Sequence, residues 1–145
     1  MKYLGALLCK NGNAHPEVNQ RLGMAQQELD ALMKIWKHTN IRLDRKVELY
    51  YSCIVSKLLY GLQSIWLTKN LRKKVEGVHS SCLRKIAGIA HSYISHVSNK
   101  EIRCITACMP IQFTLLESQL LYFGKIARSL QHPGRSLYSW MGVTI

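Results

Sequence analysis

The residues that could carry out catalysis are few and scattered in this chain of 145 residues. Metal-dependent nucleotidyl transfer needs clustered carboxylates, because these groups hold divalent cations against phosphate oxygens. The only aspartates, Asp30 and Asp44, belong to different expected helices, and the six glutamates are equally dispersed. The sequence has neither a strained G-x-S-x-G turn nor a glycine-rich phosphate loop. We therefore expect no catalytic residues and no self-contained active site in this chain.

Cysteine and histidine do not predict a metal site either. Cys104 and Cys108 are four residues apart, which is helical spacing, and His91 and His96 add no second tight pair of ligands. The five cysteines are scattered among apolar residues, which is typical of buried thiols in a reducing compartment. We expect the six histidines to be exposed residues in loops or on helix surfaces.

Binding is the function class that remains, because the chain is strongly basic. It has 20 Lys and Arg residues against 8 Asp and Glu residues, for a formal net charge of +12. Such a charge favours nucleic acid as the partner, and an anionic membrane surface is the second candidate. The alternative without function is a solvated surface that is basic but binds no partner. Lys57 and Gln63 interrupt the longest apolar stretch, so we expect no membrane-spanning helix and an intracellular protein, in the nucleus or cytoplasm.

The basic residues concentrate in the middle of the sequence. Three cations occur on one turn in Leu71-Arg72-Lys73-Lys74, where their mutual repulsion destabilises the helix unless a polyanion offsets it. A phosphate backbone is such a polyanion. The candidate residues for binding a phosphate backbone lie between positions 42 and 85. They are Arg42, Arg45, Lys46, Lys57, Lys69, Arg72, Lys73, Lys74, Arg84 and Lys85.

The elements that must position these residues are mostly helices. A short β-strand is expected over 2–10, ending in a tight turn at Asn11-Gly12. Apolar residues then recur with helical spacing in about five segments, namely 16–36, 43–60, 70–87, 98–108 and 114–130. The predicted fold class is therefore mainly α: a short N-terminal β-strand stub followed by about five amphipathic helices that form a helical bundle.

Local signals set the ends of these helices. Gly61 and Gly88 are expected to end the second and third helices, and Ser98 with Glu101 forms a capping box that begins the fourth. We expect Trp66 to anchor the segment between the second and third helices. In the last helix we expect Leu116, Leu120, Phe123, Ala127 and Leu130 to form the buried face.

Six short motifs occur in an order that is characteristic of one family. They are Lys2-Tyr3-Leu4-Gly5; Arg21-Leu22-Gly23-Met24-Ala25 leading to Ile35-Trp36; Lys57-Leu58-Leu59-Tyr60-Gly61 with Trp66; Cys82-Leu83-Arg84-Lys85-Ile86-Ala87-Gly88-Ile89; Ser98-Asn99-Lys100-Glu101-Ile102; and Tyr122-Phe123-Gly124-Lys125-Ile126-Ala127-Arg128. Over about residues 2–128 the chain resembles the C-terminal part of non-LTR (LINE-type) retrotransposon reverse transcriptases. It departs from the family pattern at Lys125, where the family usually has histidine, and at Ser64 and Ile65, where an acidic residue usually precedes the tryptophan.

The resemblance implies a division of the chain into four parts. Residues 1–12 would be the end of the palm with the primer-grip strand, and 13–90 a thumb-like helical bundle. Residues 91–131 would be a helical connection region, and 132–145 a loose tail. It also adds Lys2, Tyr3 and Gly5, from the primer-grip strand, to the candidate nucleic-acid-binding residues.

The resemblance further implies what the chain binds. The partner would be the template–primer duplex, an RNA–DNA hybrid or another nucleic-acid duplex, together with the upstream palm and fingers of the same polymerase. Mg²⁺ is implied only for the palm aspartates, whose motif this sequence lacks, so no cofactor is expected here. We therefore expect a non-catalytic thumb and connection fragment of an RNA-directed DNA polymerase. The alternative is a degenerate helical relic or a protein-interaction domain whose basicity is incidental.

Overall fold

A computed structural model describes residues 2–3, 6–7 and 14–128, with side chains from residue 14 onward. The described chain is mainly helical, as the sequence predicts. Three long helical segments form its centre: α1 (His15–Trp36), a segment running from Leu43 to Leu59, and α4 (Lys69–Ala87). Their bounds lie within two residues of those expected from the apolar spacing.

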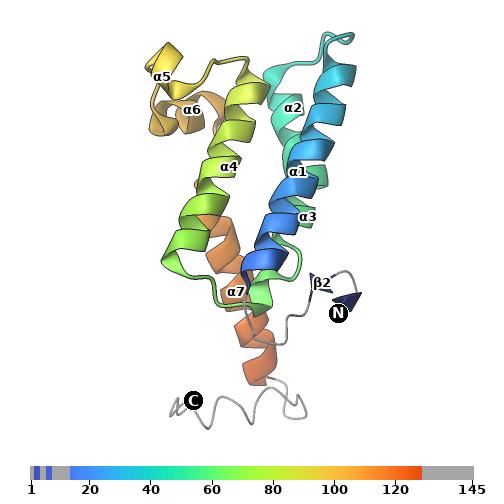
Figure 1. Ribbon diagram of the computed structural model, residues 1–145, viewed down its shortest axis with the longest axis vertical. Helices are drawn as coiled ribbons and strands as arrows, with labels where there is room; N and C mark the ends of the chain where they lie inside the picture. Colours follow the sequence, from blue (N-terminus) through green and yellow to red (C-terminus); the bar gives the residue numbers. More distant parts are fainter. Residues whose placement is uncertain (1, 4–5, 8–13, 129–145) are drawn as a thin grey trace.

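The three long segments run up, down and up (Figure 1). Two side-chain contacts show that α1 and α4 are parallel: Lys74 donates to Asn19 and Lys85 to Asp30, each pair separated by 55 residues. The middle segment is antiparallel to both. It consists of α2 (Leu43–Tyr50), a π-helical turn η1 (Tyr51–Val55) and α3 (Ser56–Leu59).

Shorter elements cover one side and one end of these helices. The 3-10 turn η2 (Leu62–Ser64) leads into α4, and α5 (Ser92–Ser95) and α6 (Asn99–Thr106) lie beside the C-terminal half of α4. The last helix, α7 (Ile111–Arg128), packs against η2 and α4 and then extends beyond the end of the bundle (Figure 1).

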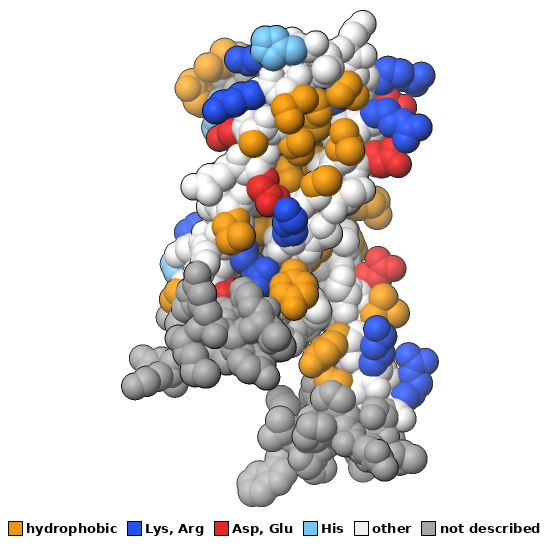
Figure 2. Space-filling view, turned by 90° about the vertical axis from the view of Figure 1, so that its right-hand side faces the viewer, with side chains coloured by type: hydrophobic (Ala, Val, Ile, Leu, Met, Phe, Trp, Pro, Cys, Tyr) orange, Lys and Arg blue, Asp and Glu red, His pale blue; other side chains and the backbone are white. Residues whose placement is uncertain are grey.

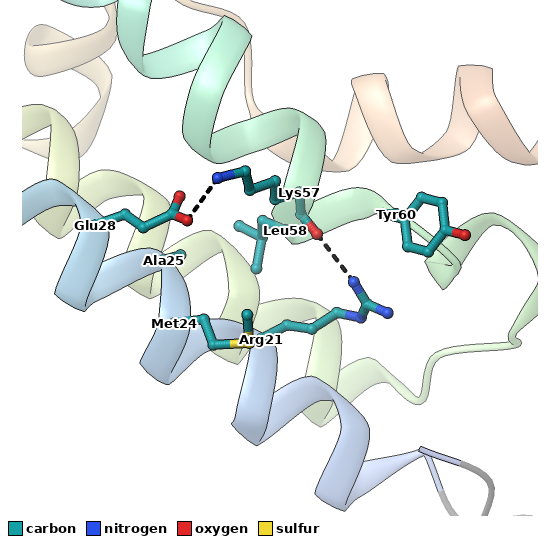
Figure 3. Close-up of a pocket in the computed structure, with 7 residues that line it drawn as sticks. All are labelled: Arg21, Met24, Ala25, Glu28, Lys57, Leu58 and Tyr60. Carbon is teal, nitrogen blue, oxygen red and sulfur yellow. Dashed lines mark hydrogen bonds and ion pairs between the residues drawn. The ribbon is translucent and has the colours of Figure 1, made fainter. Parts of the chain in front are cut away.

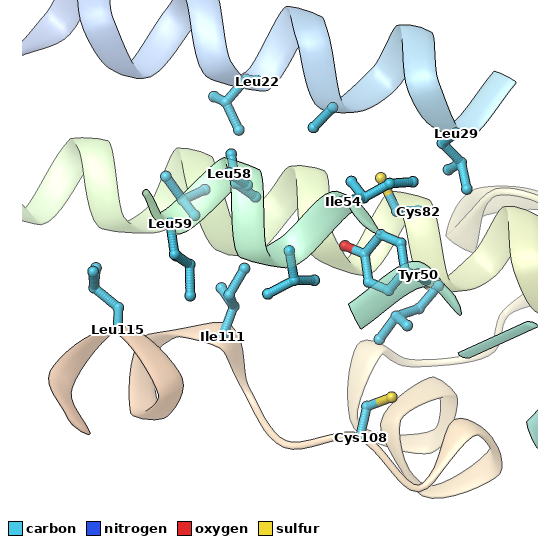
Figure 4. Packing of buried hydrophobic residues seen from close by; sticks show 14 of the residues in the cluster. Leu22, Leu29, Tyr50, Ile54, Leu58, Leu59, Cys82, Cys108, Ile111 and Leu115 are labelled. Atoms are coloured by element: carbon cyan, nitrogen blue, oxygen red, sulfur yellow. The ribbon is translucent and has the colours of Figure 1, made fainter. Parts of the chain in front are cut away.

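One hydrophobic core joins all the long helices (Figure 4). Leu22 and Leu29 of α1 meet Ile54 and Leu58 of the middle segment, while Ile111 of α7 packs on the opposite side of that segment. Ile102 of α6 belongs to the same core. The boundary expected at residues 90–91 is therefore not a boundary of the hydrophobic core.

The helix ends follow the local signals in the sequence. Gly61 and Gly88 adopt left-handed backbone angles, with φ of 78° and 69°; Gly61 follows α3 after Tyr60, and Gly88 directly follows α4. This conformation favours glycine, because a Cβ atom crowds the backbone there. Ser98 and Glu101 form the expected capping box of α6.

The buried face of α7 differs from the expected one. Ile111, Leu115 and Ile126 are buried, whereas Leu116, Leu120 and Phe123 are exposed. Helical spacing finds a stripe of apolar residues but does not say whether a neighbour covers it. In α7 the bundle covers a different stripe; of the predicted one, Ala127 is half-buried and Leu130 lies outside the described residues.

The N-terminal segment contains two very short strands. β1 (Lys2–Tyr3) pairs antiparallel with β2 (Ala6–Leu7), so that Lys2 lies opposite Leu7. The rest of the expected strand, with Gly5 and the turn at Asn11-Gly12, lies outside the described residues. The expected tail at 132–145 also lies outside them.

Candidate nucleic-acid interface

The first turns of α4 carry a dense group of cations. Thr68 caps this helix by accepting a hydrogen bond from the Leu71 backbone N–H, and the buried side chains of Leu67 and Leu71 fix the chain on either side. Four basic residues follow within six positions. They are Lys69, Arg72, Lys73 and Lys74, which we call the α4 cation group.

The α4 cation group is set apart because it has no acidic partner among the described residues. All eight acidic side chains lie in the described part of the chain, and six of them pair with cations elsewhere. Those pairs are Glu17–Arg21, Glu28–Lys57, Asp30–Lys85, Asp44–Arg42, Glu48–Arg45 and Glu76–Arg103. On the face shown in Figure 2, acidic and basic side chains accordingly lie next to one another at the margins of the upper part, around a group of hydrophobic side chains.

Trp66 lies beside the α4 cation group and is 82% exposed, more than any other large hydrophobic side chain in the described residues. The Arg72 guanidinium lies 4.9 Å from the centre of its indole ring, within cation–π distance. Arg72 also donates from Nε to the Leu67 carbonyl oxygen (3.1 Å), which holds it in this position. The expectation that Trp66 is an anchor is therefore wrong, because the neighbouring Leu67 is the buried residue.

A groove leads from Trp66 along α4 to the start of α7. It consists of two adjoining hollows of about 480 and 400 Å³, which share Arg72 and Gln112. The first hollow is lined by Trp66, Lys69 and Lys73, and the second also by Glu76, Arg103, Phe113, Leu116 and Gln119. We call the two together the α4–α7 groove.

Gln119 holds the walls of the groove together. Its side-chain amide donates to the backbone carbonyl oxygens of Leu62 (3.4 Å) and Ile65 (3.1 Å), and so ties α7 to the segment that carries Trp66. Arg103 pairs with Glu76 (3.2 Å) across α6 and α4 at the far end. No pattern in the sequence indicates the groove, because it arises where elements distant in the sequence meet.

Arg84, a predicted backbone-binding residue, lies in the interior instead. Its side chain is buried and donates to the Val97 carbonyl oxygen (2.6 Å) and to Oδ1 of Asn99 (2.9 Å). Weaker contacts reach Ala90 and Ser95. The guanidinium thus holds the connection between α4 and α6, and it is not available to a phosphate.

The other predicted cations do not form one surface with the α4 cation group. Arg42, Arg45 and Lys46 lie on or beside the start of α2, at the end of the bundle where α4 finishes (Figure 1). That end is about 27 Å from the start of α4, at 1.5 Å per helical residue. Arg42 and Arg45 pair with acids, while the Lys46 ammonium lies 5.9 Å from the centre of the Trp36 ring.

Lys57 and Lys85 are exposed but ion-paired, with Glu28 (2.6 Å) and Asp30 (2.9 Å). Lys74 donates to Asn19 (2.6 Å), a neutral partner that leaves its charge uncompensated. Lys2 and Tyr3 lie in β1, and their side chains fall outside the described part, as does the whole of Gly5. The structure therefore brings together four of the thirteen predicted residues, those of the α4 cation group.

A smaller hollow of about 170 Å³ lies between α1 and α3 (Figure 3). Arg21 donates to the Lys57 carbonyl oxygen (3.0 Å) and its guanidinium lies 5.4 Å from the centre of the Tyr60 ring. Glu17 pairs with the same arginine. These contacts satisfy a carbonyl near the end of α3, so Arg21 acts here as a structural residue.

A buried polar pair lies in the core between α2 and α4. The Tyr50 hydroxyl is hydrogen-bonded to Nδ1 of His79 (2.9 Å), and both side chains are fully buried. The pKa of His79 is lowered to about 4, chiefly by burial; the Met109 backbone opposes this decrease, and the charge of Arg103 contributes to it. Burial also raises the pKa of the Tyr50 phenol. The expectation that the histidines are exposed is wrong for His79.

Within the described residues, no three His, Cys, Asp or Glu side chains are close enough to hold a metal ion. The dispersed and mostly ion-paired carboxylates do not fit a two-magnesium site. No helix in the described part is long and apolar enough to cross a bilayer. Comparison with protein-family models, curated proteins and solved structures gave no match for this chain.

Proposed function

We propose that this chain binds a nucleic-acid duplex through its phosphate backbone, as the thumb of a non-LTR retrotransposon reverse transcriptase grips its template–primer. The observation that supports this function most is the α4 cation group, four basic residues in six positions without an acidic partner in the described chain. Cations so close together repel one another, and binding a polyanion relieves that repulsion. It also releases condensed counterions, which drives association.

The proposal assigns the chain a grip on the duplex and leaves the chemistry to other parts of such a polymerase. In the resembling family, Mg²⁺ held by palm aspartates carries out RNA-templated DNA synthesis. The proposed partners are therefore an RNA–DNA hybrid and the palm and fingers of the polymerase, in the nucleus or cytoplasm.

Salt dependence of binding tests the proposal. Fluorescence anisotropy of a labelled RNA–DNA hybrid, titrated at several salt concentrations, gives the slope of log K against log salt. Four phosphate contacts predict a slope of about −3.6, and the double variant Lys69→Gln/Lys73→Gln should reduce it to about −1.8. Lys57→Gln is the matched control, because Lys57 is exposed but paired with Glu28 on another side of the bundle. It should leave the slope unchanged.

Two outcomes would contradict the proposal. One is the absence of hybrid binding even at low salt. The other is a reduction of the slope by about 0.9 in Lys57→Gln, the same effect per charge removed as in the double variant, which would mean that total charge rather than the α4 cation group sets the affinity.

The second candidate is a protein-interaction domain, and the exposed apolar face of α7 favours it. Phe113, Leu116, Leu120 and Phe123 follow helical spacing along one side of α7, and all are exposed. Apolar stripes of this kind are typical of surfaces that bind another protein. Self-association in sedimentation velocity that Leu120→Glu abolishes, without any hybrid binding, would favour this candidate over the first.

A further inference from the structure

We propose that the α4–α7 groove binds a short single-stranded segment of nucleic acid, with one unpaired base stacked on Trp66. The inference rests on the proposed nucleic-acid binding and adds the kind of strand that the groove accepts. It depends on the two aromatic rings and the four cations that line the two adjoining hollows of the groove.

The first observation is the state of the Trp66 side chain. An indole normally buries a large apolar area when it has a structural role, yet this one is 82% exposed. Arg72 covers one face of the ring at 4.9 Å, which leaves the other face open to solvent. An exposed indole held by a stacked arginine is a platform on which a planar base can stack.

The second observation is that the groove continues from this platform to a second aromatic ring. Phe113, at the start of α7, is also exposed and lines the adjoining hollow. Arg72 and Gln112 lie between the two hollows and line both. A strand that places a base on Trp66 would therefore pass Arg72 and reach Phe113 within the same groove.

The third observation is the charge of the walls. Lys69, Arg72, Lys73 and Arg103 line the groove, against the single acid Glu76. The net charge of these five side chains is +3 (four positive, one negative), and Glu76 is already paired with Arg103. The groove thus combines aromatic surface with positive charge, as single-strand-binding surfaces do.

The choice between single strand and duplex follows from base stacking. Within a duplex each base face is covered by the neighbouring base pair. An indole ring beside the duplex therefore gains little free energy from stacking. In a single strand the faces are accessible, and aromatic side chains bind them with little sequence preference. The cations alone serve either ligand, whereas Trp66 contributes to affinity only when the bases are unpaired.

The experiment compares two probes on the full chain: a short labelled oligothymidylate and a labelled blunt-ended RNA–DNA hybrid of the same length. Trp66→Ala should weaken binding of the oligothymidylate by roughly 5- to 100-fold. It should change binding of the hybrid less than about 2-fold. Trp66→Phe, which keeps a smaller aromatic ring, should restore most of the affinity for the single strand.

The matched control is Tyr93→Ala, which removes an aromatic side chain of α5 that is 73% exposed, far from the groove. It should leave both affinities unchanged. Because Trp66 and Tyr93 are both so exposed, neither substitution is expected to disturb folding, and circular dichroism checks this.

The results separate this inference from the function it rests on. Loss of both affinities to the same degree in Trp66→Ala, or no loss of either, overturns the single-strand inference while hybrid binding by the wild type leaves the proposed function in place. Failure of the wild-type chain to bind either probe overturns both.

Discussion

His79 is a fully buried histidine whose ring meets the Tyr50 hydroxyl at 2.9 Å and stacks on the Tyr50 ring. A buried imidazole is most stable in its neutral form, because the low-dielectric core disfavours the charge. Its pKa in the folded chain, about 4, lies below the ordinary value of 6.5. The unfolded chain therefore binds more protons than the folded chain between these two pH values.

This difference predicts an acid-sensitive fold. The contribution of neutral His79 is complete above about pH 6.5 and is lost progressively as the pH falls to about 4, reducing the free energy of unfolding by about 3 kcal/mol. Urea unfolding at a series of pH values, compared with the variant His79→Gln, measures the effect. The variant should be less stable at neutral pH and lose less stability on acidification. Equal pH dependence in both proteins would contradict the assignment.

Single side chains are also where sequence-based prediction reached its limit. Arg84 is one basic residue among several on α4, and nothing in its local pattern distinguishes it from its exposed neighbour Lys85. It is buried because the connection from α4 to α6 places the carbonyl oxygen of Val97 and the side chain of Asn99 around it. Those partners are 13 and 15 residues away, beyond what helical spacing can indicate. The same holds for Trp66, which is exposed while the adjacent Leu67 is buried, a difference that the apolar character of the two residues does not indicate.

At the scale of elements, the sequence predicted most helices well because their signals are local. A proline at the start of α1, glycines after α3 and α4, and a capping box at α6 each satisfy or release backbone groups within a few residues. Which face of a helix is buried does not depend on such local signals, because it is decided by neighbours that are distant in the sequence. For α7 the apolar stripe was visible in the sequence, but the neighbours that cover the other stripe were not.

Two glycines, one within α4 and one at its C-terminal end, should respond in opposite ways to alanine. Gly77 lies within α4, and a Cβ there would meet no atom within 4 Å. Gly77→Ala should therefore stabilise the protein by about 0.5–1 kcal/mol through helix propensity. Gly88→Ala, at φ of 69°, should destabilise it by about 1 kcal/mol or more. Chemical denaturation at neutral pH measures both, and the same sign for the two variants would contradict the backbone geometry.

At the scale of the whole molecule, a single core connects α1 to α7. Ile111 is almost completely buried and packs against the middle segment, and it lies in the part of the chain expected to be the helical connection region. Domains that share a core unfold together, whereas separate cores give separate transitions. The shared core therefore predicts cooperative behaviour across residues 14–128.

Ile111→Ala tests this prediction from a site far along the chain from α1. It should lower the free energy of unfolding by about 2–5 kcal/mol, because it leaves a cavity in the core. In a background where Trp36 is the only tryptophan (Trp66→Phe and Trp140→Phe), its fluorescence should report the same midpoint as far-ultraviolet circular dichroism. A transition of Trp36 that is unaffected by Ile111→Ala would instead indicate two independent units.

The π-helical turn at Tyr51–Val55 widens the buried face of the middle segment, where Tyr50 and Leu59 are buried as well as Ile54 and Leu58. This wider turn encloses about one residue more than an α-helical turn does. The positions that face the core after the turn are therefore shifted by one residue from those that regular α-helical spacing would give. Tyr50 before the turn and Leu59 after it are both buried, although a regular α-helix would set them about 180° apart around its axis. The turn is thus equivalent to a one-residue insertion that the fold has absorbed. Its solvent-facing side is formed by Ser52 and Cys53, which are exposed, so the extra residue is accommodated without opening the core.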